Sequence, residues 1–322
     1  MLIPTLCRPE MLRRVLSRLD RQTAPGSSFE VVVVADVAER DLEALDRLLA
    51  NHSYRTRCLQ GSRAGASAAR NEAWRAAASD ILLFLDDDVL PEPRLVAEHV
   101  AWHRCHPAEE VDVFGHVRWA DDLKVTPFMR WLENGIQFDY PNIEGGEAGW
   151  GRFYTAHASV KRALVERVGG FEEEALPFGY EDLDLVLRMH KHGFRLLYCR
   201  TAVAEHLHPM DLDFWKRRVA RIAVSERAFV RMHPEIPPYF FGMFSAAAAE
   251  TPARGRGARL ARIVPRSIPL VGPRVWASVD AVYRQALAEP FLTAWQRAGD
   301  EVSQGPPARG RLAGRPSSGR GC

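Results

Sequence analysis

The triplet Asp86-Asp87-Asp88 follows directly on the apolar run Ile81–Leu85. A run this short and this apolar predicts a strand buried on both faces. Carboxylates at its end would lie in the crevice where open α/β sheets bind their ligands. Two like charges ~4 Å apart near a protein surface repel by roughly 4 kcal/mol, so the triplet favours a positively charged partner. A divalent cation with oxygen ligands is the natural candidate, and a solvated acidic turn is the alternative.

A second acidic cluster, Glu181, Asp182 and Asp184, follows Gly179-Tyr180 and opens an amphipathic helix predicted over residues 181–192. Acids in a first helical turn complement the helix dipole, and Asp184 can pair with Arg188 four residues later. A structural role would therefore account for this cluster. The string is nevertheless specific enough to be a candidate site.

The sequence lacks the usual glycine motifs for binding phosphate. No G-x-G-x-x-G follows a predicted strand, and no G-x-x-x-x-G-K is present. Classical dinucleotide-binding and P-loop sites are therefore disfavoured. A cation held by the triplet at 86–88 would be another way to bind phosphate.

Strand and helix patterns alternate over residues 1–120, which predicts parallel βαβ units in a doubly wound sheet. The alternation then becomes irregular. Strands are predicted at 1–3, 31–34, 57–59, 81–85, 111–117, 153–159, 195–199 and 202–208. Helices are predicted at 9–19, 42–49, 66–78, 128–138, 161–168, 181–192, 211–233 and, as one or two helices, 275–298. A further helix is predicted to start at Pro91 and Pro93 and to run through Val96, Val100 and His103.

The 322 residues suffice for one large α/β domain with an appendage, and the hydrophobic fraction of 47% is ordinary for a globular protein. Residues 251–322 carry twelve Arg and four acids, whereas residues 1–250 carry a net charge of −6. The basic end indicates either an anionic partner or a solvated, disordered segment.

The five cysteines show no metal-type spacing, which favours reduced thiols. Neither a signal peptide nor a membrane-spanning run is recognisable in the sequence.

Several short strings together resemble family 2 glycosyltransferases, and they occur in the order of that family. They are Ile3-Pro4-Thr5 with Arg8-Pro9, then Asp36, Ala69-Arg70-Asn71, Asp86-Asp87-Asp88 with Pro91, Gly169-Gly170-Phe171-Glu172-Glu173, Tyr180-Glu181-Asp182-Leu183-Asp184-Leu185, and His206. The resemblance covers residues 1 to about 210 and implies a GT-A fold, with a mostly parallel, Rossmann-like sheet flanked by helices. It also implies inverting transfer from a UDP-, GDP- or TDP-sugar to a hydroxyl group, using Mn²⁺ or Mg²⁺.

The resemblance also implies residue roles. Nucleotide contacts would come from Pro4, Thr5, Arg8, Asp36, Arg70, Asp86 and Asp87, and metal contacts from Asp88 and His206. Simple exposure is favoured for Asp87, and a solvated position is the alternative for Arg70. Asp182 would be the general base, with Glu181 orienting it or binding the acceptor.

Further side chains are candidates with equally good structural interpretations. His208 is a weaker metal candidate than His206, and Trp150 and Tyr180 would either stack on a sugar or pack in the core. The glycine-rich loop at 145–151 would be a lid or a plain surface loop. Thr155 and the residues after it replace the Gly-Asn usual in the family, so we expect an unusual acceptor side.

The expected organisation is a nucleotide-sugar-binding half at 1–120 and an acceptor and catalytic half of the same domain at 121–210. A helical, Arg-rich C-terminal extension at 211–302 and a disordered tail at 303–322 would follow. We expect a sugar, glycolipid or other hydroxyl acceptor, a cytoplasmic location and no nucleic-acid partner. The basic segment at 254–274 would contact the inner face of a membrane peripherally.

Two other functions remain open on sequence grounds. A nucleotidyltransferase could use a similar sheet, although Pro4-Thr5-Leu6 and Cys7 stand where its glycine-rich first loop would be. A non-catalytic module that binds sugar nucleotides, with the basic end as an assembly surface, is the other alternative.

Overall fold

A computed structural model of the chain describes residues 1–6, 8–39, 41–133, 135–143, 146–176, 179–252 and 271–303. Within these residues, one eight-stranded sheet has the strand order β3-β2-β1-β4-β7-β6-β8-β5. The strands are β1 Leu2–Thr5, β2 Glu30–Ala35, β3 Arg55–Gln60, β4 Ile81–Leu85, β5 Val89–Pro91, β6 Val111–Trp119, β7 His157–Lys161 and β8 Arg195–His206. The sheet is mixed. Strand β1 pairs in parallel with β2 and β4, and the pairs β2 with β3 and β6 with β8 are also parallel. The pairs β4 with β7, β6 with β7 and β5 with β8 are antiparallel.

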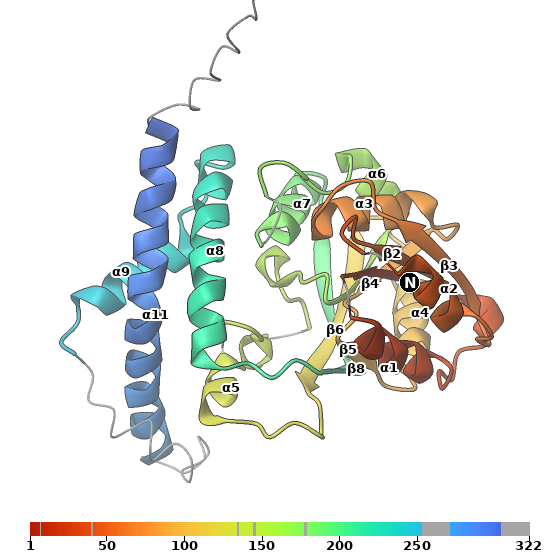
Figure 1. The fold of residues 1–322 in the computed structure, drawn as a ribbon, viewed down its shortest axis with the longest axis horizontal. Coiled ribbons are helices and arrows are strands. Elements are labelled where there is room, and N and C mark those ends of the chain that lie inside the picture. The colour runs from red at the N-terminus through yellow and green to blue at the C-terminus, as the bar shows by residue number, and fades with distance from the viewer. Residues whose placement is uncertain are drawn as a thin grey trace, which may run out of the picture.

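Helices cover both faces of this sheet (Figure 1). Helices α1 Pro9–Leu19, α2 Leu42–Leu49 and α4 Leu95–Cys105 pack on one face, and α3 Ala66–Ala76, α6 Arg162–Val168 and α7 Glu181–His190 pack on the other. Strand β2 has a continuously apolar sequence because both of its faces are buried. Val31 and Val33 point into the first layer and Val32 and Val34 into the second, and all four are fully buried.

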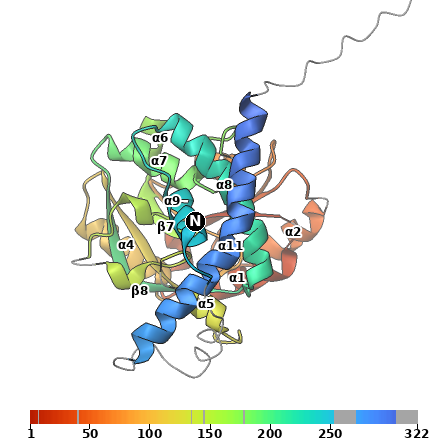
Figure 2. The same ribbon diagram turned by 90° about the vertical axis from the view of Figure 1, so that its left-hand side faces the viewer.

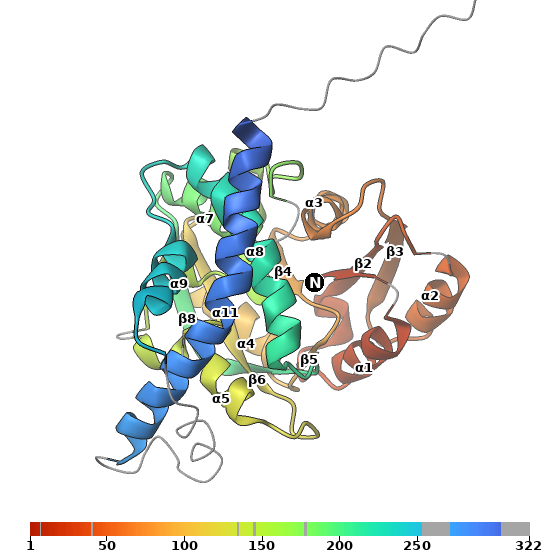
Figure 3. The same cartoon turned by 60° about the vertical axis from the view of Figure 1, so that its left-hand side comes forward.

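A third core joins the sheet to the helical extension. It lies between the end of β6 and the helices α5 Pro127–Leu132, α8 Leu212–Met232, α9 Tyr239–Ala249 and α11 Val271–Ser303. The predicted helix at 275–298 is part of α11, a continuous 33-residue helix that contains Pro290. Figures 1, 2 and 3 show α8 and α11 side by side, with α8 on the side of the sheet.

Some predicted boundaries are wrong for local reasons. The helix predicted at 128–138 ends at Leu132, because Gly135 adopts a φ of 112° and the N–H groups of Gln137 and Phe138 turn back to the carbonyl of Leu132. The strand predicted at 153–159 starts only at His157, after a turn in which the His157 N–H bonds the Tyr154 carbonyl at 3.2 Å. The extended pieces at 195–199 and 202–208 are one strand, β8, opposite an irregularity in β6.

Strand β5 was not predicted, because two prolines follow the acidic triplet. Pro91 is compatible with β5 since this strand lies at the edge of the sheet, where a missing N–H is tolerated. Most of the basic segment at 254–274 and the tail from 304 lie outside the described residues. Among the described helices, none has both the length and the apolarity that a bilayer crossing requires. Cys58, Cys105 and Cys199 are free thiols.

Candidate active site

A cavity of about 900 Å³ opens between the ends of β1, β2 and β4 and the helices α8 and α9. All predicted nucleotide, metal and base residues line this cavity. The two acidic clusters therefore face one space, although nearly a hundred residues separate them in sequence. We refer to Asp86, Asp87 and Asp88 as the donor-side carboxylates, and to Glu181 and Asp182 as the helix-start carboxylates.

The donor-side carboxylates differ sharply in environment. Asp87 was expected to be exposed, and this is wrong: its residue is 0% exposed and its carboxylate accepts a 2.6 Å hydrogen bond from the Thr5 hydroxyl. Arg8 forms an ion pair with Asp87 and a 2.8 Å pair with Asp88. Burial raises the pKa of Asp87 to about 7, against the opposing effects of Arg8 and Thr5. The first turn after β1 is thus tied to the end of β4.

Asp36, at the end of β2, organises the neighbouring loop. Its carboxylate accepts hydrogen bonds from the backbone N–H groups of Ala38 at 2.9 Å and of Gly65 at 3.0 Å. Gly65 precedes α3 and has a φ of 108°, a backbone conformation that favours glycine. Asp36 and Gly65 both line the cavity, and so does Pro4.

Arg70 joins the two acidic clusters directly. From α3 its guanidinium donates to Glu181 at 3.0 Å and to Asp86 at 3.3 Å, and it lies 3.9 Å from Asp182. Burial alone would lower its pKa, but these carboxylates raise it above the usual value. Only 5% of Arg70 is exposed, so the alternative of a solvated surface arginine is wrong.

The adjacent Asn71 has a structural task. Its side chain donates to the Phe171 carbonyl and accepts from the Phe171 N–H, both at 2.9 Å. Gly170, with a φ of 82°, passes so close that a Cβ atom there would lie 2.4 Å from the Asn71 side-chain oxygen. The Ala-Arg-Asn string therefore places Arg70 in the cavity and fixes the Gly-Gly-Phe corner that precedes α7.

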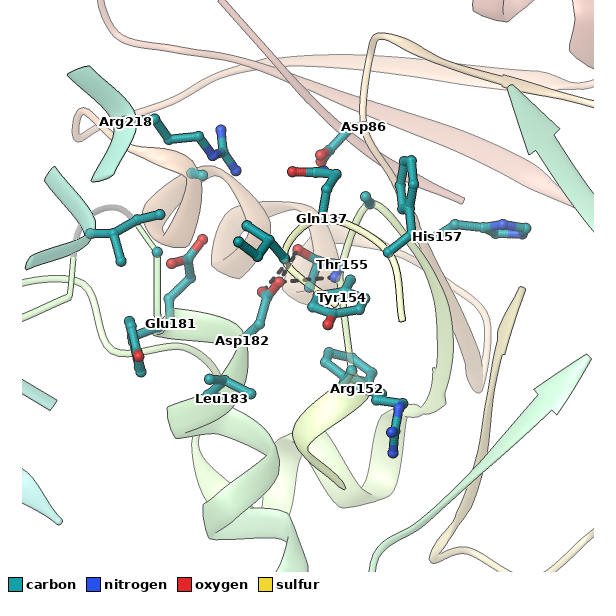
Figure 4. A pocket seen from close by; sticks show the side chains of 18 of the residues that line it. Asp86, Gln137, Arg152, Tyr154, Thr155, His157, Glu181, Asp182, Leu183 and Arg218 are labelled. Atoms are coloured by element: carbon teal, nitrogen blue, oxygen red, sulfur yellow. Dashed lines mark hydrogen bonds between the residues drawn. The ribbon is translucent and has the colours of Figure 1, made fainter. Parts of the chain in front are cut away.

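Asp182 lies at the centre of the cavity wall (Figure 4). Its carboxylate accepts from the Thr155 N–H at 3.0 Å and from the Thr155 hydroxyl at 2.9 Å. Burial raises the pKa of Asp182 to about 7, with Glu181 acting in the same direction and Arg70 and Thr155 opposing. A carboxyl group with this pKa can exchange protons near neutral pH, as a general base must.

Asp184 has the structural role that its spacing predicts. Its carboxylate forms a 2.7 Å ion pair with Arg188 and also contacts His233, the residue after α8, at 2.8 Å. Its residue is fully buried, and it does not line the cavity. The acidic string at the start of α7 is thus divided into two cavity carboxylates and one packing carboxylate.

The predicted metal ligands Asp88 and His206 lie on adjacent segments. The Leu207 N–H bonds the Asp88 carbonyl at 2.8 Å, and β5, which starts at the next residue, pairs Val89 with His206. Burial lowers the pKa of His206, which favours the neutral imidazole that binds metals. Within the described residues, no three His, Cys, Asp or Glu side chains gather as a metal site. One carboxylate and one imidazole fit a divalent ion whose remaining ligands are phosphate oxygens and water.

Neither Arg218 nor the contact between Thr155 and Asp182 was predicted from the sequence. Arg218 comes from α8 and points into the cavity on the side of Asp86 (Figure 4). Burial lowers its pKa, whereas Asp86, Glu181 and Asp88 raise it, so Arg218 lies within electrostatic reach of both acidic clusters. An arginine on the cavity-facing side of a helix with apolar residues at 215, 219 and 222 could have been noticed from helical periodicity.

The aromatic candidates also belong to the cavity wall. Trp150 and Tyr180 both line it, and the Tyr180 ring packs on Phe229 of α8 with ring centroids 5.0 Å apart. Arg152 in the same region forms a 2.8 Å ion pair with Asp139. His208 also lines the cavity, with its ring 4.9 Å from that of Phe214.

Solved structures share the fold of this chain. One is a mannosyltransferase from Pyrobaculum calidifontis, solved with GDP-Man and Mn²⁺ (TM-score 0.58, 21% identity, 90% of this chain and 86% of that one). Another is residues 1–349 of Staphylococcus aureus TarS with UDP-GlcNAc (TM-score 0.52, 13% identity, 93% and 90%). At these identities the likeness shows the GT-A fold and nothing finer.

Curated relatives match in sequence. Validoxylamine A glucosyltransferase of Streptomyces hygroscopicus subsp. limoneus is 28% identical, and the match covers 77% of this chain and 61% of the relative. The glycosyltransferase YfnE of Bacillus subtilis, itself uncharacterized, is 27% identical over 65% of each chain. The chain thus spans somewhat less than two thirds of these relatives. The sequence profile described as "Glycosyltransferase like family 2" matches residues 1–224, and the chain therefore belongs to this glycosyltransferase family.

Proposed function

We propose that this protein transfers a sugar from a nucleoside-diphosphate sugar to an acceptor hydroxyl group, with inversion at the anomeric carbon. The observation that carries the proposal is the bridging position of Arg70, which contacts Asp86 on the donor side and Glu181 on the base side. One sugar bound across Arg70 could therefore meet both clusters. Family membership and the shared GT-A fold support the same reaction class.

The donor would lie along the ends of β1, β2 and β4. Pro4, Thr5 and Asp36 surround the end of the cavity that would hold the nucleoside. Arg8, Arg70 and Arg218 bring guanidinium groups to the region that would hold the diphosphate. Arginine suits this task because its planar fork matches phosphate oxygens. UDP-, GDP- and TDP-sugars are all compatible with these groups, and related folds have been solved with GDP-Man and with UDP-GlcNAc.

Asp88 and His206 would hold Mn²⁺ or Mg²⁺ together with the donor diphosphate. When bound, such an ion stabilises the charge that develops on the departing phosphate oxygens. Arg8 forms a 2.8 Å ion pair with Asp88, so metal binding would require the Arg8 side chain to move toward the phosphates. Arg8 has room for this movement, since 40% of its side chain is exposed.

Asp182 would take the proton from the acceptor hydroxyl as that oxygen attacks the anomeric carbon. Thr155 would orient the Asp182 carboxylate, because both its N–H and its hydroxyl donate hydrogen bonds to that group. Attack from the side opposite the leaving diphosphate gives inversion, and no covalent intermediate on the enzyme is needed. Glu181 would keep Arg70 in place and contact the acceptor.

A thermal-shift screen of nucleotide sugars with Mn²⁺ would identify the donor, since a ligand at 100 times its Kd stabilises the fold by about 2.7 kcal/mol. Release of nucleoside diphosphate with an acceptor panel would then test transfer. Asp182→Asn should keep donor binding and lower turnover by roughly 10²- to 10⁴-fold, whereas Asp213→Asn, a change at an exposed carboxylate on α8, should leave turnover unchanged.

Other outcomes would reject the proposal. Full turnover by Asp182→Asn would exclude Asp182 as the base. Release of pyrophosphate would indicate nucleotidyl transfer, and donor binding without turnover on a broad acceptor panel would indicate a binding module.

A further inference from the structure

Tyr180 has an unusual backbone conformation for a bulky residue. Its φ is 71°, and Asn51 is the other non-glycine residue with a positive φ among those described. This left-handed conformation costs a non-glycine residue roughly 1–2 kcal/mol, so contacts elsewhere must maintain it. Tyr180 immediately precedes Glu181 and Asp182, and its carbonyl accepts the Asp184 N–H at 2.8 Å. Its conformation therefore determines how α7 starts and where the helix-start carboxylates point.

The contact that holds Tyr180 comes from the helical extension. Its hydroxyl donates to the carboxylate of Glu226 on α8, and its ring packs on Phe229 one turn further along. Glu226 is 0% exposed, although a buried carboxylate is costly unless it is well bonded. The backbone N–H groups of Phe240 and Phe241, in the first turn of α9, satisfy it at 2.7 and 2.9 Å.

The arrangement at Glu226 thus joins three segments: the turn before α7, the middle of α8 and the start of α9. The bond between Asp184 and His233 adds a second link between α7 and the end of α8. Glu226, Tyr180 and Phe240 also line the cavity.

We propose that the Tyr180–Glu226 hydrogen bond positions Asp182 for proton transfer, so that the rate of transfer depends on helices α8 and α9 as well as on the sheet. Neither residue touches the reacting atoms in this scheme. Glu226 and Tyr180 are positioning residues that act through the conformation of the turn. The inference rests on the proposed transfer reaction with Asp182 as base.

The test compares Tyr180→Phe and Glu226→Gln with Tyr54→Phe. Tyr54 is a matched control, because it is a buried tyrosine remote from the cavity whose hydroxyl donates to the Leu16 carbonyl at 3.0 Å. Tyr180→Phe should lower kcat about 10- to 100-fold, the effect of a misplaced catalytic group, while the donor KM changes less than about twofold. Tyr54→Phe should lower Tm similarly and leave kcat unchanged.

The double variant gives a second criterion. If one bond carries the effect, Tyr180→Phe combined with Glu226→Gln should be no slower than the slower single variant. Unchanged kcat in the single variants that fold, beside an active wild type, would overturn the inference alone. If Tyr180→Phe does not fold, Glu226→Gln decides. An inactive wild type, with no nucleoside diphosphate released from any donor, would overturn the proposed function and the inference with it.

Discussion

Replacing Thr155 by valine would change the proton affinity of Asp182 while leaving its surroundings almost intact. The Asp182 carboxylate receives two kinds of donor from this residue, the backbone N–H at 3.0 Å and the hydroxyl at 2.9 Å. Valine keeps the backbone donor and the branched shape but removes the hydroxyl donor. Hydrogen bonds to a carboxylate favour its charged form, so losing one must raise the pKa of Asp182.

The size of the shift follows from the strength of the bond. A hydrogen bond to a charged group is worth roughly 1.5–3 kcal/mol, and one pKa unit corresponds to about 1.36 kcal/mol. The pKa of Asp182, which burial raises to about 7, should therefore rise further by roughly one to two units. Because the base must be ionised, kcat/KM at pH 7 should fall roughly 5- to 50-fold and recover at higher pH.

The assay measures the release of nucleoside diphosphate and gives kcat/KM as a function of pH. The pH dependence of kcat/KM reports the pKa values of the free enzyme. The wild-type acid limb should lie near pH 7 and that of Thr155→Val about one to two units higher. Thr56→Val is the control, because the Thr56 hydroxyl bonds the Leu49 carbonyl at 2.8 Å, away from the cavity. An acid limb that stays in place, or that moves to lower pH, would refute the assignment of Asp182 as the base.

Three further predictions concern the cation, the donor and acid stability. A chelator and Asp88→Ala should each abolish transfer, and activity that survives both would remove the metal from the mechanism. Arg218→Met should raise the donor KM about 10- to 100-fold by removing a charge-assisted phosphate contact, whereas the same change at the exposed Arg217 should have little effect. Burial lowers the pKa of His103 to about 4 and that of His157 to about 3. At these two sites the unfolded chain binds more protons below pH ~6.5, so each histidine lowers stability by about 2 kcal/mol at pH 5, whereas the raised pKa values of Asp87 and Asp182 act in the opposite direction. His103→Gln should therefore lose about 2 kcal/mol less stability than the wild type between pH 7 and pH 5, and equal changes in urea midpoint for the two proteins would contradict this.

The sequence identified the elements whose signal is local. The apolar run before Asp86 is strand β4, and the alternation of strands and helices over the first hundred residues matches β1 to β4 with their helices. The pairing of Asp184 with Arg188 also followed from spacing alone. In each case the information lies within one element or its immediate neighbours, which is where periodicity and capping patterns act.

The errors concern contacts made across the chain. Asp87 looked exposed because Thr5 and Arg8, which bury and neutralise it, lie about eighty residues earlier. The strand predicted at 153–159 was placed too early, because the backbone there bonds Asp182 instead of a neighbouring strand. Glu226 did carry a usable signal, since it shares the spacing of the buried residues Ile222 and Phe229 on one side of α8.

We expect the charge balance of the cavity to link metal binding to donor binding. The donor-side and helix-start carboxylates together face two directly paired arginines, Arg8 and Arg70, and Arg218 lies within electrostatic reach. Even with all three arginines counted and Asp87 protonated, this region carries more negative than positive charge. A diphosphate that enters it is repelled unless a cation accompanies it.

Metal and donor should therefore each raise the affinity for the other by the same factor, because coupling between two binding equilibria is reciprocal. Asp88→Ala should weaken this coupling more than it weakens donor binding without metal. Equal donor affinity with and without Mn²⁺ in the wild type would mean that the arginines alone balance the diphosphate.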